Sequence, residues 1–201
     1  AALLFDFFDR FFHSLLHSSS PIGVQLDSLA DVITSGLAPA AVLWQVCLQT
    51  EPCWLPEGWK LGYGVFVLAA FSALRLAKFN IDETQTVEFC GLPTPAGSLL
   101  CASLGMLWQQ GMLALSSDGV LLVAVLTSLL LVSPIRMFAL KFHGFGWRGN
   151  EVRYLFLLAS IVLIIILRTY AIPVIIVLYI VVSAVRWLCM RSGNPDKAPK
   201  A

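Results

Sequence analysis

Apolar blocks of about 20 residues, separated by short polar segments, run through most of the chain, and a helix of that length crosses a hydrocarbon core of roughly 30 Å. Backbone polar groups in lipid must find their partners within the segment, so each block is interpreted as a helix. The pattern predicts an all-α fold, a polytopic transmembrane bundle of about six full spanning helices. These helices are expected at 22–47, 61–79, 96–115, 119–140, 152–169 and 172–190.

The two ends of the chain depart from this pattern. The first apolar block, 1–16, is too short to span a bilayer and is followed by a polar turn over 17–21. We interpret it as a partial N-terminal helix and expect an upstream segment to be missing. The membrane domain is therefore predicted over 1–190, truncated at its N-terminus. A polar tail is predicted over 191–201.

The composition also indicates a membrane protein. Hydrophobic residues make up 58% of the chain and charged residues 12%. A soluble domain of 201 residues has too much surface for its volume to hide so many apolar side chains. The net charge of +1 gives no sign of nucleic-acid binding. The five cysteines lack metal-binding spacing. Cys47 and Cys53 flank one polar loop, and they are either a disulfide in an oxidising compartment or two unrelated thiols.

Basic residues indicate how the helices are oriented. If the turn at 17–21 is cytoplasmic and the sides alternate from there, Lys60 and Arg168 fall near the outer face. The other basic residues all fall at or near the cytoplasmic face: Arg10, Arg75, Lys78, Arg136, Lys141, Arg148, Arg153, Arg186, Arg191, Lys197 and Lys200. Cytoplasmic loops carry an excess of lysine and arginine, so this distribution also supports the predicted number of helices.

Four aspartates lie in two consecutive membrane segments, Asp6 and Asp9 in the first and Asp27 and Asp31 in the second. Spacings of three and four place each pair on one helical face. An ionised carboxylate in a membrane helix is costly unless it is paired or coordinated. Because hard oxygen ligands suit Mg²⁺ or Mn²⁺, the aspartates predict a divalent-metal site. The alternatives are that they cap helices near the interface, or that they bind ions in a transporter or channel.

The spacing of these aspartates is also that of a known signature. The segment Asp6-x2-Asp9-x13-Gly23-x3-Asp27-x3-Asp31 resembles the CDP-alcohol phosphatidyltransferase signature, D-x2-D-G-x2-A-R-x8-G-x3-D-x3-D. Further stretches resemble the branch of that family that makes phosphatidylserine: Ile22 to Asp31, Arg75-Leu76-Ala77-Lys78-Phe79-Asn80, Gly91-Leu92-Pro93-Thr94-Pro95-Ala96 and Met137 to Phe142. The similarity covers nearly the whole chain, apart from a missing first transmembrane helix.

The resemblance implies a bacterial inner-membrane enzyme, with its active site facing the cytoplasm and a homodimeric assembly. It would transfer the phosphatidyl group from CDP-diacylglycerol to L-serine, giving phosphatidylserine and CMP. The alternative is another acceptor alcohol, such as glycerol phosphate or inositol. By the same resemblance, Asp6, Asp9, Asp27 and Asp31 would bind Mg²⁺ or Mn²⁺, and Asp31 would also act as general base on the serine hydroxyl. Gly23, Asp9 and Asp27 would contact the nucleotide.

The acceptor's carboxylate requires a cation. Arg75 and Lys78 are candidates, because they lie one turn apart at a helix end and arginine suits a carboxylate. The alternative for both is that they are topology signals at the cytoplasmic face. Asn80 and Thr94 are further candidates, as residues at the entrance to the substrate site.

Three positions depart from the signature. Arg10 replaces the family glycine, and His13 and Ser14 replace the alanine and the arginine. In the family, the glycine and the alanine let a helix backbone approach the cytidine nucleotide closely. Arg10 lies four residues after Asp6, so an arginine there can pair with Asp6 and compete with a metal. A catalytically impaired relative, kept as a structural or interaction protein, is therefore an alternative to an active enzyme.

Overall fold

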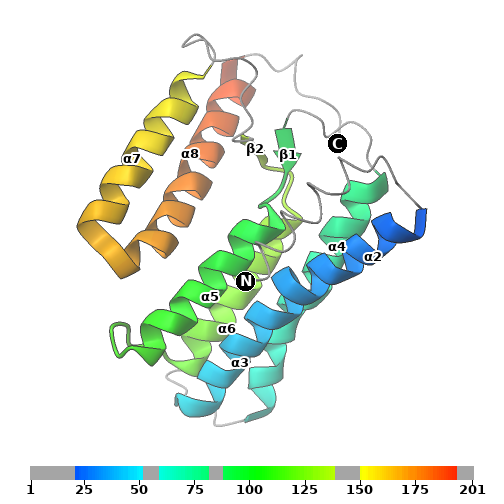
Figure 1. The fold of residues 1–201 in the computed structure, drawn as a ribbon, viewed down its shortest axis with the longest axis vertical. Helices are drawn as coiled ribbons and strands as arrows, with labels where there is room; N and C mark the ends of the chain where they lie inside the picture. The colour runs from blue at the N-terminus through cyan, green and yellow to red at the C-terminus, as the bar shows by residue number, and fades with distance from the viewer. Residues whose placement is uncertain (1–20, 52–58, 82–87, 139–149, 194–201) are drawn as a thin grey trace.

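The computed structural model describes residues 21–51, 59–81, 88–138 and 150–193. Figure 1 shows helices in these ranges and one small two-stranded sheet. The elements in chain order are α2 (Pro21–Val32), the π-helix η1 (Ile33–Leu37), α3 (Ala38–Gln49), the 3-10 helix η2 (Trp59–Phe66), α4 (Val67–Ile81), β1 (Glu88–Cys90), α5 (Thr94–Gln109), α6 (Ser117–Leu131), β2 (Arg136–Phe138), α7 (Glu151–Leu167), the 3-10 turn η3 (Arg168–Tyr170) and α8 (Ala171–Gly193).

Helices α2 to α6 pack together, and α7 and α8 form a hairpin beside them (Figure 1). Within the first group, α3 contacts α5 and α6, and α4 contacts α6. The hairpin joins the group through α8, which contacts α5 and β2. Its turn is tight, because Arg168 has a φ of 47°, in the left-handed region.

Three helical stretches in the described part of the chain are long and apolar enough to cross a membrane: Gln25–Gln49, Gly62–Asn80 and Glu151–Met190. The last of these reverses direction at η3 and so contains both arms of the hairpin. Helices α5 and α6 have 16 and 15 residues, or about 24 and 22 Å at 1.5 Å per residue. They fall short of a hydrocarbon core of roughly 30 Å, so the predicted number of six full spans is not confirmed.

Large apolar side chains are exposed along the outer faces of the helices. Leu155, Ile165 and Ile166 of α7 are 69–71% exposed, and α2, α6 and α8 also carry exposed leucine, isoleucine or valine. In water such a surface would be costly, whereas lipid solvates it at no such cost. The long apolar helices and this surface together are those of an integral membrane protein.

The described part of the chain is mostly helical, as predicted, but a two-stranded ribbon interrupts the helices in one region. The predicted helix at 119–140 ends at Leu131, because Pro134 cannot continue a helix and disfavours helical backbone before it. The chain then forms β2, which pairs antiparallel with β1, with Phe89 opposite Met137. A single strand leaves its backbone N–H and C=O groups without partners. By pairing, β1 and β2 provide hydrogen-bond partners for the backbone of two segments that lie outside the helices.

Gly91 makes the connection from β1 to α5 possible. It has a φ of 77°, and a Cβ there would overlap the backbone carbonyl oxygen of Leu131. Its N–H donates to the Ile135 carbonyl at 2.9 Å, and the Leu92 N–H donates to the Leu130 carbonyl at 2.9 Å. These two bonds tie the segment before α5 to the end of α6 and to the residue before β2, and so they place Thr94, the first residue of α5.

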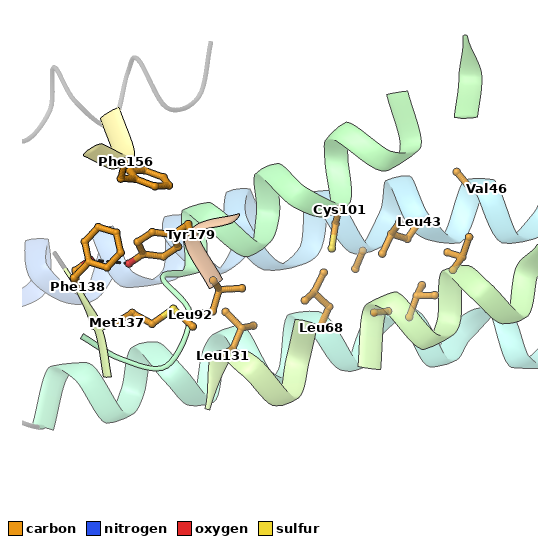
Figure 2. Packing of buried hydrophobic residues seen from close by; sticks show 14 residues of the cluster. Leu43, Val46, Leu68, Leu92, Cys101, Leu131, Met137, Phe138, Phe156 and Tyr179 are labelled. Carbon is orange, nitrogen blue, oxygen red and sulfur yellow. Dashed lines mark hydrogen bonds between the residues drawn. The ribbon is translucent and has the colours of Figure 1, made fainter. Parts of the chain in front are cut away.

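The buried core runs along the helix group and continues under the ribbon (Figure 2). Leu43, Leu68, Cys101 and Leu131 fill the space between helices, each at most 1% exposed. Toward β2, the core becomes aromatic. Phe138 packs edge-on against Phe156 and Tyr179, with ring centroids 5.6 and 4.9 Å apart. The α7–α8 hairpin is therefore anchored to the rest of the protein by side chains and not by the membrane alone.

A close approach between η1 and α4 sets where α2 crosses α4. Gly36 is buried, and a Cβ on it would lie 2.9 Å from the Cβ of Ser72. The five-residue π-helical stretch begins two residues after Asp31, and such stretches often occur at functional sites. The crossing therefore decides how far Asp31 lies from α4.

Candidate functional site

Three of the predicted site residues lie along one face of α2. Gly23, Asp27 and Asp31 follow one another at intervals of four, so their side chains project from the same side of the helix. All three are partly buried, whereas Leu26 and Leu29 on the other side are 66% and 60% exposed. Asp6 and Asp9, with Arg10, His13 and Ser14, lie outside the described residues.

The end of α4 is joined to this helix by a side-chain hydrogen bond. The Asn80 amide nitrogen donates to the hydroxyl of Ser28 at 2.9 Å. Ser28 directly follows Asp27, so Asn80 holds the end of α4 beside the acidic segment. Sequence reasoning assigned Asn80 to the entrance of the substrate site and did not single out Ser28, which stands within the family-like stretch 22–31.

Arg75 is the central cation of the site, and only 8% of it is exposed. Its Nη1 donates to the hydroxyl of Thr94 at 2.5 Å, across the break between α4 and α5. The guanidinium also interacts electrostatically with the negative charge of Asp31 on α2. Three residues predicted from separate parts of the sequence are thus brought together by the fold.

One side-chain nitrogen of Arg75 makes no hydrogen bond within the described part of the protein. Its Nε is buried and has no hydrogen-bond partner there. A buried donor without a partner costs about 1–3 kcal/mol, so an anionic ligand that accepted from it would remove this cost. A lysine or arginine that marks topology would instead extend toward lipid headgroups, and the burial of Arg75 does not fit that alternative.

Lys78 lies one turn after Arg75 and is exposed, in the last turn of α4. Its exposure fits the alternative interpretation, a basic residue at the cytoplasmic end of a helix. The two cations that sequence reasoning treated together therefore occupy different environments.

Sequence reasoning missed Tyr179 of α8. The Tyr179 hydroxyl donates to the Phe138 carbonyl at 2.9 Å (Figure 2). The residue also lies within electrostatic range of Arg75. A single tyrosine in an apolar helix carries no signal of such a role, because its spacing relates it to nothing in α4. The last helix in the described part of the chain, α8, therefore also comes close to Arg75.

The structure describes Cys47, one of the two cysteines that could form the predicted disulfide. The Cys47 thiol is free and donates to the Ser117 carbonyl at 3.7 Å, near the start of α6. Cys53, its possible partner in a disulfide, lies outside the described residues.

The described residues supply part of a metal site. No group of three or more possible metal-binding side chains (His, Cys, Asp or Glu) forms within 21–51, 59–81, 88–138 and 150–193. Asp27 and Asp31 provide two carboxylates on one face, which is the oxygen chemistry that Mg²⁺ and Mn²⁺ prefer. This pair fits half of the predicted ligand set, and Asp6 and Asp9 would have to supply the rest.

Known proteins are similar to this chain over most of its length. The family model for CDP-alcohol phosphatidyltransferase matches residues 1–139. The CDP-diacylglycerol–serine O-phosphatidyltransferase of Bacillus subtilis strain 168 is 31% identical over 145 residues, which cover 71% of this chain and 73% of that protein. The protein of the same name from Mycobacterium tuberculosis strain H37Rv is 33% identical over 216 residues, covering 100% of this chain and 72% of its own. The chain therefore belongs to the CDP-alcohol phosphatidyltransferase family.

Proposed function

We propose that this membrane enzyme transfers the phosphatidyl group from CDP-diacylglycerol to L-serine, releasing CMP. Family membership favours catalysis over a transporter or channel. The observation that favours an acceptor with an anionic group, as serine has, is the placement of a buried arginine, Arg75, within electrostatic range of Asp31. The names of the similar proteins support the same acceptor.

Arg75 is suited to hold the carboxylate of the acceptor. A guanidinium has five N–H donors and no acceptor, and it pairs with carboxylates in a fixed geometry. Thr94 accepts from Nη1, which fixes the plane of the group and leaves Nε for a ligand. Glycerol phosphate offers a phosphate to the same cation, whereas inositol offers no anion.

Asp31 is placed to act on the acceptor's hydroxyl. With serine's carboxylate on Arg75, Asp31 would accept the proton of the serine hydroxyl as its oxygen bonds to the phosphorus that carries diacylglycerol. The bond from that phosphorus to the bridging oxygen breaks, and CMP leaves with this oxygen. The exchange converts a phosphoanhydride into a phosphodiester and needs no oxidant or reductant.

Asp6, Asp9, Asp27 and Asp31 would hold Mg²⁺ or Mn²⁺. When bound, such an ion would neutralise the pyrophosphate and the charge that develops on the CMP leaving group. Gly23, Asp9 and Asp27 would line the part of the site that binds the nucleotide. Gly23 has no side chain to obstruct the approach of the cytidine.

We place the enzyme in a bacterial inner membrane, as a homodimer with its site at the cytoplasmic face. Lys78 near the end of α4, Arg136 in β2 and Arg153 near the start of α7 belong to elements whose ends lie toward one side of the molecule (Figure 1). Arg168, in the turn between α7 and α8, belongs to the other side. This distribution supports the orientation through the excess of basic residues in cytoplasmic loops.

The test is CMP release from CDP-diacylglycerol by the purified protein in detergent, with Mn²⁺ and labelled serine. We expect labelled phosphatidylserine and CMP in equal amounts, and loss of both in Asp31→Asn and after chelation of the metal. Lys78→Gln is the matched control for a change in charge. Clear use of glycerol phosphate or inositol without serine incorporation would reject serine as the acceptor.

A further inference from the structure

Two contacts join α2 and its continuation η1 to α4, and the polar one has no role in the proposed mechanism. Figure 1 shows α2 and α4 next to each other, and the two helices touch. In α2, the Ser28 hydroxyl accepts a hydrogen bond from the Asn80 amide nitrogen of α4 at 2.9 Å. In η1, Gly36 packs so closely on α4 that a Cβ there would lie 2.9 Å from the Ser72 Cβ.

The two contacts are in register. From Ser28 to Gly36 the chain advances by eight residues, and the facing positions of α4 move back by eight, from Asn80 to Ser72. The two segments are therefore antiparallel, and about 12 Å separates the contacts along each of them at 1.5 Å per residue. A slip by one helical turn would break both contacts at once.

Asp31 and Arg75 lie between these contacts. Asp31 follows Ser28 by three residues, and Arg75 follows Ser72 by three. Residues three apart share a helical face, so each charged residue lies one turn inside a contact, on the side that faces the other helix. The electrostatic interaction between the two agrees with this placement. The contacts on either side therefore set the distance between the carboxylate and the guanidinium.

The two contacts differ in how firmly they hold. Gly36 and Ser72 are buried, the serine at 0% exposed, and a close-packed interior yields little. The bond between Ser28 and Asn80 lies at the exposed surface. Without that bond, the start of α2 could shift about the buried contact while the core stayed intact.

We propose that Ser28 and Asn80 are positioning residues: their hydrogen bond holds α2 against the end of α4 and keeps Asp31 at the distance from Arg75 that transfer to the acceptor requires. This inference rests on the proposed roles of Asp31 and Arg75. It gives Asn80 a role that acts through Ser28, in place of direct contact with the substrate.

A double-mutant cycle in the full chain tests the bond. Ser28→Ala and Asn80→Ala should each lower kcat/KM for serine about threefold to tenfold, the usual effect of losing one hydrogen bond. The double variant should lose no more than either single variant, because both changes remove the same bond. The KM for CDP-diacylglycerol should stay unchanged.

Two further variants complete the experiment. Exchanging the partners, Ser28→Asn with Asn80→Ser, keeps one amide and one hydroxyl on opposite helices and should recover most of the lost activity. Ser160→Ala is the matched control, because the Ser160 hydroxyl donates to the Phe156 carbonyl within α7 at 2.8 Å.

Losses that multiply in the double variant would overturn the proposal, as would a larger loss in Asn80→Ala than in Ser28→Ala, which would indicate direct contact with the substrate. Full activity in both single variants would overturn it too. If the unmodified protein released no CMP in response to serine, the proposed function would fail instead, and backbone hydrogen exchange would decide the positioning role. Faster exchange over 21–32 in Ser28→Ala than in Ser160→Ala supports it, and equal rates overturn it.

Discussion

The hydrogen bond from Arg75 Nη1 to the Thr94 hydroxyl joins two residues that are 19 positions apart, across the break between α4 and α5. Both side chains are buried, at 8% and 2% exposed. Thr94 is held by the Gly91 turn and by the backbone bonds of Gly91 and Leu92, which reach Ile135 before β2 and Leu130 at the end of α6. The orientation of the cation in the site is therefore determined by the connection that leads into α5.

Thr94→Val tests this bond. Valine keeps the shape of threonine but cannot accept from Arg75, so a buried N–H loses its partner at a cost of about 1–3 kcal/mol. We expect the serine KM to rise about tenfold, which corresponds to roughly 1.4 kcal/mol, with little change in the KM for CDP-diacylglycerol. Thr94→Ser, which keeps the hydroxyl, is the control. Equal kinetics for the valine and serine variants would show that the bond does not matter for the acceptor.

The two cations of α4 should differ in their effects. Arg75→Lys keeps the charge but removes the Nε and the planar fork, so serine use should fall by at least tenfold. Lys78→Gln removes an exposed charge and should change serine use less than twofold, since exposed ion pairs contribute about 0–1 kcal/mol. Initial rates against serine concentration measure both. A larger effect at Lys78 than at Arg75 would contradict the assignment of the acceptor site.

Glycines 91 and 111 provide a matched pair for backbone strain. Both have positive φ, 77° and 69°, but a Cβ on Gly91 would overlap the Leu131 carbonyl, whereas a Cβ on Gly111 has nothing within 4 Å. Gly111→Ala should cost about 1 kcal/mol, the ordinary penalty for alanine at positive φ. Gly91→Ala should lower the melting temperature in detergent much more and abolish serine-dependent turnover. Similar melting temperatures would argue against the tight turn at Gly91.

The close contact between η1 and α4 can be tested by enlarging the residue on one side and then reducing the residue that faces it. Gly36→Ala places a methyl group 2.9 Å from the Ser72 Cβ, and overpacking of this kind costs about 1–3 kcal/mol. We expect a lower melting temperature and weaker activity, because Asp31 lies next to the displaced segment. The double variant Gly36→Ala with Ser72→Gly should recover part of both. If the second change brought no recovery, the close contact would not be the cause of the loss.

The departures from the family signature lead to a prediction about the N-terminal segment. Restoring Arg10→Gly, His13→Ala and Ser14→Arg together should raise the rate of CMP release if an arginine beside Asp6 competes with the metal. The KM for Mn²⁺ should fall in parallel, because one carboxylate is freed. Ser14→Arg alone is the control for added charge. No change in either quantity would show that these positions do not limit the enzyme.

The sequence by itself determines the membrane helices, the shared face of one helix and the family of this protein. The lengths of the apolar blocks indicate membrane helices, because a helix must satisfy its own backbone in lipid. Spacings of four place Gly23, Asp27 and Asp31 on one face, because the helical repeat relates residues within a single helix. The same spacing carries the family resemblance, which the family match over residues 1–139 confirms.

Only the tertiary structure decided which parts of different helices meet. The helical repeat does not relate Arg75 to Thr94, Asp31 or Tyr179, and their meeting depends on close contacts such as Gly36 with Ser72 and on the turn at Gly91. The β1–β2 ribbon escaped prediction for the same reason, since short strands are set by their partners and not by their own apolar pattern. Burial, too, is a property of the packed bundle, and it separates Arg75 from Lys78, two cations that are equivalent in the sequence.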